Sequence, residues 1–192
     1  MSEFKFKKQE MKLTKILTLV LCFTAGTIMA QDQLPATALK TLSGEKVIIT
    51  DIVDSNKITI LSFWATWCKP CKLELDNFAE YYEDWQEDYN VEIIAITIDD
   101  ARQLRKVRPM VNTKQWEYTV LSDVNRDLHK ALGGVDIPYT VVVKNGKILY
   151  THSGYKLGDE EDLEEKIEDW ASDKSEEDKA KPEKQETDGE KK

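Results

Sequence analysis

A pair of cysteines between a predicted strand and a predicted helix constrains this chain more than any other feature. Cys68 and Cys71 are separated by two residues. Residues 58–63, which precede them, are rich in β-branched and aromatic side chains, and this composition predicts a buried strand. Apolar residues after the pair recur at roughly helical spacing, which predicts a helix over residues 69–87. The chain therefore passes from strand to helix at the two cysteines.

The start of a helix is a position that activates sulfur. Proline is favoured in the first helical turn, where its missing N–H needs no partner, so Pro70 places Cys68 at or just before the N-cap. Unpaired N–H groups and the helix dipole then stabilise a thiolate, and the positive charge of Lys69 acts in the same direction. We expect Cys68 to attack a disulfide, and the more buried Cys71 to resolve the mixed disulfide that forms.

Two other roles for the cysteine pair fit the sequence less well. A structural disulfide that closes so short a loop would add little stability through chain entropy. A structural zinc site needs four ligands, and the other candidates, Cys22, His129 and His152, are isolated in the sequence. We therefore predict a redox-active disulfide with no metal and no further cofactor. Metal binding by Cys68 and Cys71 is the alternative.

Two segments of the chain resemble thioredoxin-fold oxidoreductases. Residues 63–72, FWATWCKPCK, are similar to the active-site strand and helix start of that family. Residues 134–143, GVDIPYTVVV, resemble its loop with a cis-proline and the strand that follows. The resemblance covers about residues 32–172. It implies an α/β thioredoxin fold, in which helices flank a central mixed sheet.

The resemblance also assigns residues to a substrate surface. It implies that the peptide bond before Pro138 is cis and that Ile137 lies beside the active sulfurs. The backbone of Ile137 could then pair with a substrate strand, since proline adds no competing N–H donor. Trp67 is expected to pack beside Cys68 and to border this surface. The alternative for Pro138 is an ordinary loop proline before a strand.

Several residues are similar to one branch of the family. Glu74 follows Cys71 by three residues, which matches the Cys-x-x-Cys-x-x-Glu pattern of thiol reductases similar to TlpA and ResA. Ser62 stands where thioredoxin has a buried aspartate that moves protons. The stretch from Cys71 to Pro138 is longer than in thioredoxin and leaves room for a central strand–helix insertion. Residues 42–49 resemble the N-terminal β-hairpin of this branch and of peroxiredoxins.

A peroxiredoxin is disfavoured by the spacing around the cysteines. Those enzymes place a threonine three residues before a single peroxidatic cysteine. Here Thr66 stands two residues before Cys68, and a second cysteine follows closely.

Glu74 has two interpretations. Its carboxylate could accept the proton of Cys71, or raise the pKa of that thiol by like-charge repulsion. It could also be an ordinary first-turn glutamate that the helix dipole favours.

Residues 11–30 have the layout of a secretory signal peptide. A short positive region follows Met11, the expected start, and we predict cleavage after Ala30, so that residues 1–30 are extension and signal. The redox pair then supplies the only cysteines of the mature protein. We expect it in the periplasm or cell envelope, where disulfides persist. An uncleaved membrane anchor over residues 13–30 is the alternative, although a span needs about 20 apolar residues.

Residues 31–172 suffice for one thioredoxin-like domain with one core. Residues 173–192 are almost entirely charged and polar, which predicts a disordered tail. The formal net charge of −9 argues against nucleic acid binding, and we expect a monomer. The predicted elements are a hairpin at 40–50, strand 58–64, helix 69–87, strand 91–98, helix 100–111, strand 118–121, helix 125–132, strands 139–144 and 147–152, and helix 159–171.

We therefore predict an exported thiol–disulfide oxidoreductase that reduces protein disulfides through Cys68 and Cys71, with Glu74 as a third catalytic residue. By resemblance, it accepts electrons from a membrane donor and passes them to protein substrates such as apocytochrome c. One alternative is a metal-handling module for copper or heme-pathway ligands. Another is a periplasmic disulfide oxidant or isomerase, which is disfavoured because the helical insertion and dimerisation domain of such proteins are missing from the sequence.

Overall fold

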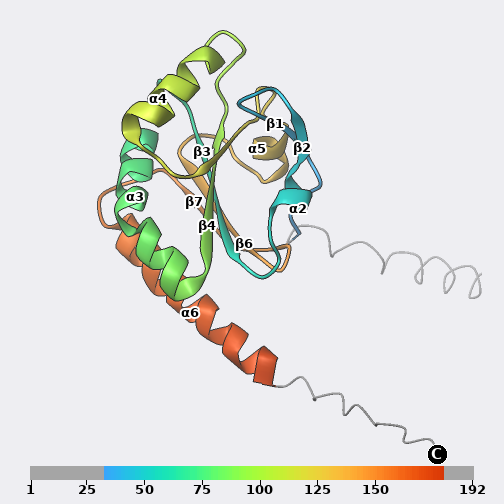
Figure 1. Cartoon of the computed structure of the whole chain (residues 1–192), viewed down its shortest axis with the longest axis vertical. Helices are drawn as coiled ribbons and strands as arrows, with labels where there is room; N and C mark the ends of the chain where they lie inside the picture. The colour runs from blue at the N-terminus through green and yellow to red at the C-terminus, as the bar shows by residue number, and fades with distance from the viewer. Residues whose placement is uncertain (1–32, 180–192) are drawn as a thin grey trace, which may run out of the picture. The chain divides into compact units, whose positions relative to one another are not determined.

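Seven strands form one mixed sheet in the computed structural model, which describes residues 33–179 (Figure 1). The strand order is β2-β1-β5-β4-β3-β6-β7. The strands are β1 (Ala38–Thr41), β2 (Lys46–Ile48), β3 (Ile58–Trp64), β4 (Val91–Thr97), β5 (Thr119–Ser122), β6 (Tyr139–Lys144) and β7 (Lys147–Ser153). Strand β3 pairs in parallel with β4 and antiparallel with β6. The predicted central mixed sheet is confirmed.

Helices cover both faces of this sheet. They are α2 (Ile49–Ile52), α3 (Lys69–Tyr89), the 3-10 helix η1 (Leu104–Lys106), α4 (Val107–Lys114), α5 (Asp127–Ala131) and α6 (Asp159–Lys179). Adjacent side chains of β3 point to opposite faces. On one face, the Ser62 hydroxyl donates a hydrogen bond to Glu74 of α3. On the other face, the Phe63 ring packs against His129 of α5. Helices α3 and α6 contact each other beside the sheet (Figure 1).

The central strand delivers the chain to the cysteines. All seven residues of β3 are buried, and in β4 only Glu92 is partly exposed. Such apolar strands are expected where helices cover a sheet on both sides. Strand β3 ends at Trp64 and α3 begins at Lys69, so the segment between them lies at the carboxyl end of the central strand.

The predicted hairpin at 40–50 lies at one edge of the sheet, and a second hairpin, of β6 and β7, lies at the other. The N-terminal hairpin pairs β1 with β2 and joins the sheet through β5. Its second strand is short, because residues 49–52 form α2, in which Ile49 is buried. The C-terminal hairpin turns through Asn145 and Gly146, whose φ angles of 53° and 73° fit a two-residue turn between antiparallel strands.

The helix predicted over residues 100–111 begins later in the structure, as η1 and then α4. Asp100 marks the predicted start. Its Oδ1 accepts the backbone N–H groups of Arg102 and Gln103, both at 2.9 Å. This is the bonding pattern of a helix N-cap, but residues 101–103 form a turn and residues 104–106 a 3-10 helix before the α-helix begins.

Helix α6 extends to Lys179, beyond its predicted end at residue 171. The first residues of the predicted tail, 173–179, therefore belong to this helix, and the disorder of the tail stays a prediction. The rest of the predicted tail, and the predicted signal segment, lie outside the described residues. Within residues 33–179, none of the helices is long and apolar enough to cross a membrane.

Candidate active site

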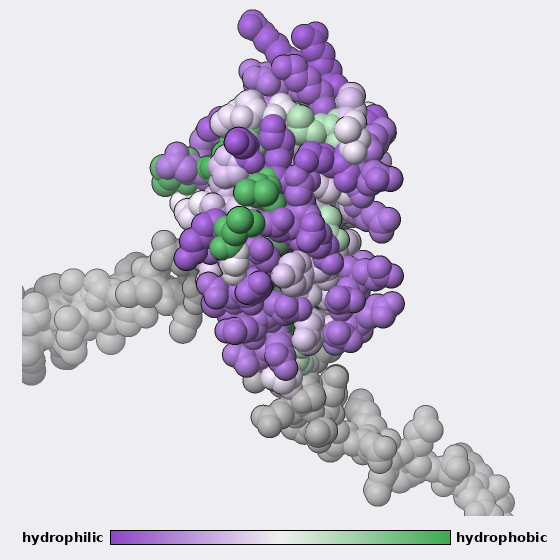
Figure 2. All heavy atoms as spheres, turned by 90° about the vertical axis from the view of Figure 1, so that its left-hand side faces the viewer, coloured by the Kyte–Doolittle hydropathy of each residue, from purple (hydrophilic) through white to green (hydrophobic). Residues whose placement is uncertain are grey.

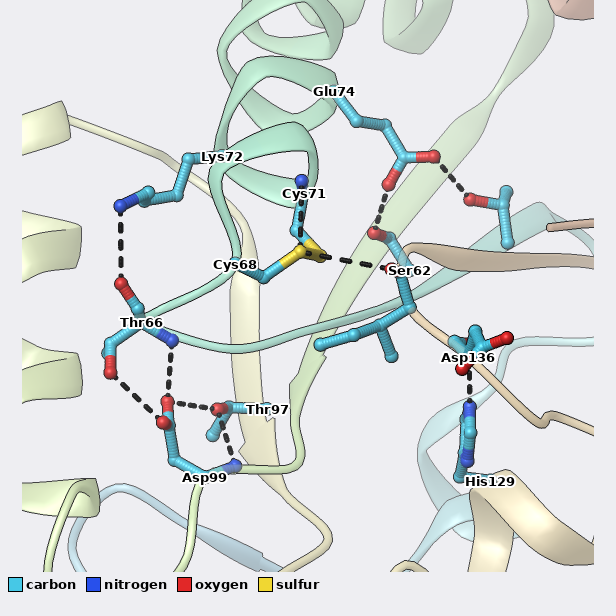
Figure 3. Close-up of a disulfide and its surroundings, with 12 residues drawn as sticks. Ser62, Thr66, Cys68, Cys71, Lys72, Glu74, Thr97, Asp99, His129 and Asp136 are labelled. Carbon is cyan, nitrogen blue, oxygen red and sulfur yellow. Dashed lines mark hydrogen bonds between the residues drawn. A yellow bond between two sulfur atoms is a disulfide. The ribbon is translucent and has the colours of Figure 1, made fainter. Parts of the chain in front are cut away.

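Cys68 and Cys71 are joined in a disulfide at the start of α3 (Figure 3). Cys68 is the N-cap residue, and Pro70 lies in the first turn, as predicted. The backbone N–H of Cys71 donates to Cys68 Sγ at 3.3 Å. A helix N-terminus that directs an N–H at sulfur stabilises the thiolate of that residue once the disulfide opens.

The two sulfurs differ in exposure. Cys71 is fully buried, whereas Cys68 is 5% exposed and follows Trp67, which is 54% exposed. Lys69 and Pro70 are exposed in the first turn of the helix. A second sulfur can therefore approach the pair only from the side of Cys68.

The loop before β6 also contacts Cys68. The Ile137–Pro138 peptide bond is cis. The carbonyl oxygen of Ile137 lies 3.9 Å from Cys68 Sγ. The backbone N–H of Gly154 donates to the carbonyl of Pro138 at 2.8 Å, which ties the loop to the end of β7. The structure thus brings together the two segments that the sequence analysis singled out.

Glu74 lies on the turn of α3 that follows Cys71, and its side chain is 1% exposed. Its carboxyl oxygens accept hydrogen bonds from Ser62 Oγ and Thr140 Oγ1, both at 2.8 Å (Figure 3). The interpretation as an ordinary first-turn glutamate is therefore wrong, because this side chain points into the protein, beyond the first turn. A helix-dipole effect at the surface does not explain the buried position of this carboxyl group.

Burial raises the pKa of Glu74 to about 7, against the two hydroxyl hydrogen bonds, which lower it. The negative charge of Asp159 raises it further. Residues three apart on a helix are neighbours, so this carboxyl group can exchange a proton near neutral pH one turn from Cys71.

The partners of Glu74 were missed in the sequence analysis. Ser62 of β3 stands directly opposite Thr140 of β6 in the sheet. Both are fully or almost fully buried hydroxyl residues in strands that are mostly apolar. A pair of hydroxyl residues on buried strands was the available signal, but only the strand register shows that they meet at one carboxyl group.

A second polar group, which the sequence analysis also missed, holds the segment before Cys68. Asp99 follows β4 and is fully buried. It accepts hydrogen bonds from the backbone N–H and the hydroxyl of Thr66. Figure 3 shows this contact below the disulfide, on the side away from Glu74.

The two histidines have separate surroundings. His129 is buried against Phe63 and Tyr139, and burial lowers its pKa. His152 Nε2 lies 3.2 Å from Asp159 Oδ2. Across the part of the chain that the structure describes, no group of three His, Cys, Asp or Glu side chains could hold a metal ion.

Gly134 supports the cis-proline loop by leaving space for His129. A Cβ at position 134 would lie 2.4 Å from two atoms of the His129 ring, and that ring is 1% exposed. The ring also lies 3.2 Å, through Nε2, from the carbonyl oxygen of Asp136, in the same loop. We predict that Gly134→Ala lowers the free energy of unfolding by about 1–3 kcal/mol, since overpacking costs that much. Urea denaturation measures the loss.

A double-mutant cycle tests the cause of that loss. If the clash with the ring is responsible, Gly134→Ala costs much less in a His129→Ala background. An equal cost in both backgrounds would contradict the explanation.

A helix-capping Cys-x-x-Cys disulfide, next to a cis-proline loop on a mixed sheet, is the arrangement of thioredoxin-like thiol–disulfide oxidoreductases. The chain is an enzyme of this class. The profile of the AhpC/TSA family matches residues 30–151, and the chain belongs to that family.

Named relatives agree with this assignment. Thiol-disulfide oxidoreductase ResA of Bacillus thuringiensis subsp. konkukian is 28% identical over 172 residues, which cover 83% of this chain and 95% of ResA. Sporulation thiol-disulfide oxidoreductase A of Bacillus subtilis is 27% identical over 135 residues, or 67% of this chain and 79% of that protein. A solved thioredoxin-like protein of Porphyromonas gingivalis is 39% identical, with a TM-score of 0.66 over 75% of this chain and 95% of its own. The predicted resemblance to the ResA branch is confirmed.

Proposed function

We propose that this protein reduces disulfides of other proteins outside the cytoplasm by dithiol exchange at Cys68 and Cys71. The Cys68 thiolate attacks a substrate disulfide, which forms a mixed disulfide and releases one substrate sulfur as a thiol after it takes a proton. Cys71, once deprotonated, attacks the sulfur of Cys68. This step restores the Cys68–Cys71 disulfide and releases the second substrate thiol. Two electrons and two protons pass to the substrate.

The contact of the Cys71 N–H with Cys68 Sγ carries this proposal. It makes Cys68 the sulfur that the helix start stabilises as a thiolate. The small exposure of Cys68, against none for Cys71, supports the same order of attack. No cofactor beyond the disulfide itself is needed for this chemistry.

Glu74 is the group proposed to take the proton of Cys71 before the second step. With a pKa of about 7, it is partly ionised at neutral pH and can accept a proton there. Its negative charge also opposes a thiolate at Cys71. Strong oxidants of this fold owe their potential to a stabilised reduced form. Because the buried carboxyl group disfavours the Cys71 thiolate, it does not stabilise the reduced form in this way. This supports a reductase.

The substrate surface is proposed to consist of Trp67, Ile137 and Pro138. Val135, in the same loop as Ile137, is 82% exposed and extends it with a further apolar group. Figure 2 shows one face of the molecule, which is mostly hydrophilic with a few small hydrophobic groups. Small apolar groups of this kind suit brief contact with an extended protein substrate and a chain that is monomeric between encounters.

The proposed location and partners rest on the signal pattern before residue 31 and on the resemblance to ResA. In this proposal a membrane protein supplies electrons, and apocytochrome c is one class of substrate. We predict that the protein recovered from the cell envelope begins at Gln31, which N-terminal sequencing would read. A chain that retains residues 13–30 would support the anchored alternative.

Reduction of insulin by dithiothreitol tests the activity, because cleavage of the insulin disulfides produces measurable turbidity. We expect catalytic amounts of this protein to accelerate the reaction. Titration with copper(I), under the same conditions, tests the metal-handling alternative. Tight stoichiometric copper binding without reductase activity would contradict the proposal.

A further inference from the structure

The end of β4 places a fully buried carboxyl group beneath the segment that leads to Cys68. Asp99 Oδ2 accepts the backbone N–H of Thr66 and the hydroxyl of Thr97, both at 2.8 Å. Its Oδ1 accepts the hydroxyl of Thr66 at 2.9 Å. Figure 3 shows Thr66 directly between Asp99 and the disulfide segment. Hydrogen bonds to a charged acceptor are among the stronger ones in proteins.

Thr66 is also held from the helix. Lys72 Nζ donates to the carbonyl oxygen of Thr66 at 3.2 Å. Thr66, which is 6% exposed, is therefore bonded through its N–H and hydroxyl by Asp99 and through its carbonyl by Lys72. We name this group of Asp99, Thr66 and Lys72 the Thr66 clamp.

The clamp matters most in the state in which Cys68 reacts. In the oxidised protein, the disulfide itself ties Cys68 to α3. Reduction removes that bond, and the backbone around Thr66 then has to keep Cys68 in place. The backbone N–H of Cys68 donates to the carbonyl of Ala65 at 3.0 Å, so a shift of this segment moves Cys68 with it. Small displacements of a nucleophile lower reaction rates steeply.

We infer that Asp99 is a positioning residue for disulfide exchange, which acts through Thr66 to hold Cys68 in line with an incoming disulfide. The inference rests on the proposed role of Cys68 as the attacking sulfur. Asp99 itself touches neither the substrate nor the reacting sulfurs. Its effect should therefore appear in the rate of attack by the reduced protein, even when the fold of the oxidised protein is intact.

The test uses the full chain in its reduced form and a small disulfide, oxidised glutathione, which makes few contacts besides the sulfurs. An asparagine amide offers one acceptor oxygen where a carboxyl group offers two. We expect Asp99→Asn to lower the second-order rate constant about tenfold, the size expected for one lost charge-assisted hydrogen bond. Exchange of the Thr66 amide hydrogen should accelerate in the same variant. Thr113→Val, which removes an exposed hydroxyl on α4, should change neither quantity.

A matched pair at the same position separates positioning from folding. Thr66→Ser keeps the hydroxyl that bonds Asp99 and should retain the wild-type rate constant, whereas Thr66→Val should be slow. If Asp99→Asn fails to fold, the two Thr66 variants test the inference by themselves. The inference is overturned if Asp99→Asn folds and reacts at the wild-type rate, or if both Thr66 variants are equally slow. If the wild-type protein itself reduces no disulfide, the proposed function fails instead.

Discussion

Replacing Cys68 with serine abolishes disulfide reduction, and replacing Cys71 with serine yields a protein that stops at the mixed disulfide. A hydroxyl group cannot form a disulfide, so Cys68→Ser loses the first step. We expect its activity to fall by on the order of a thousandfold or more, to the uncatalysed rate. Cys71→Ser keeps the sulfur at the helix N-cap but lacks the one that resolves the intermediate. The insulin assay measures the first effect, and mass spectrometry detects the trapped substrate in the second.

The two variants are matched controls for each other. Both remove the disulfide, so both lose the same cross-link within the folded domain. A difference between them therefore reports the separate roles of the sulfurs. Trapping of substrate by Cys68→Ser, with none by Cys71→Ser, would reverse the assignment.

Replacing Glu74 with glutamine removes a pH dependence from the stability of the oxidised protein. The pKa of Glu74 is raised from its ordinary value of 4.5 to about 7 in the folded state. The folded protein therefore binds a proton that the unfolded chain has lost between these pH values. The stability that protonated Glu74 contributes is fully present below pH 4.5. It falls as the pH rises to about 7 and stays lost above that pH. The loss amounts to about 3 kcal/mol.

Urea denaturation of the wild-type protein and of Glu74→Gln at pH 4 and pH 8 measures this difference. Glutamine can still accept one hydroxyl and donate to the other, so the buried group keeps its partners. We expect the variant to gain about 3 kcal/mol relative to wild type between pH 4 and pH 8. Glu83→Gln, on an exposed position of the same helix, should follow the wild-type curve. Parallel curves for wild type and Glu74→Gln would contradict the raised pKa.

The same variant should slow the second step of the reaction. Without the carboxyl group, the thiol of Cys71 loses its proposed proton acceptor. The mixed disulfide should then accumulate transiently, and the pH–rate profile should lose its limb near pH 7. Rapid acid quenching followed by mass spectrometry would detect the intermediate. An unchanged pH–rate profile would leave Glu74 with a structural role alone.

Local patterns were sufficient to predict the reactive segment. The position of Cys68 at the helix N-cap follows from the spacing of apolar residues and from Pro70, all within one stretch of chain. The loop with Pro138 and the strand after it were recognised by their resemblance to thioredoxin-fold oxidoreductases. The central sheet followed from runs of Ile and Val, whose composition requires cover on both faces.

Interactions between distant segments could not be predicted. The burial of Glu74 depends on Ser62 and Thr140, which meet only through the register of β3 with β6. The bond between Asp99 and Thr66 depends likewise on where β4 ends relative to β3. No periodic pattern encodes these contacts, because each is set by how separate elements pack.

The reduction potential of the Cys68–Cys71 pair tests the central claim most directly. Equilibration of the protein with dithiothreitol or glutathione buffers, followed by acid trapping of the thiols, gives the fraction reduced at each potential. For a reductase of protein disulfides we expect a value below about −200 mV, on the side of thioredoxin at about −270 mV. A value near that of strong oxidants, about −120 mV, would contradict the account.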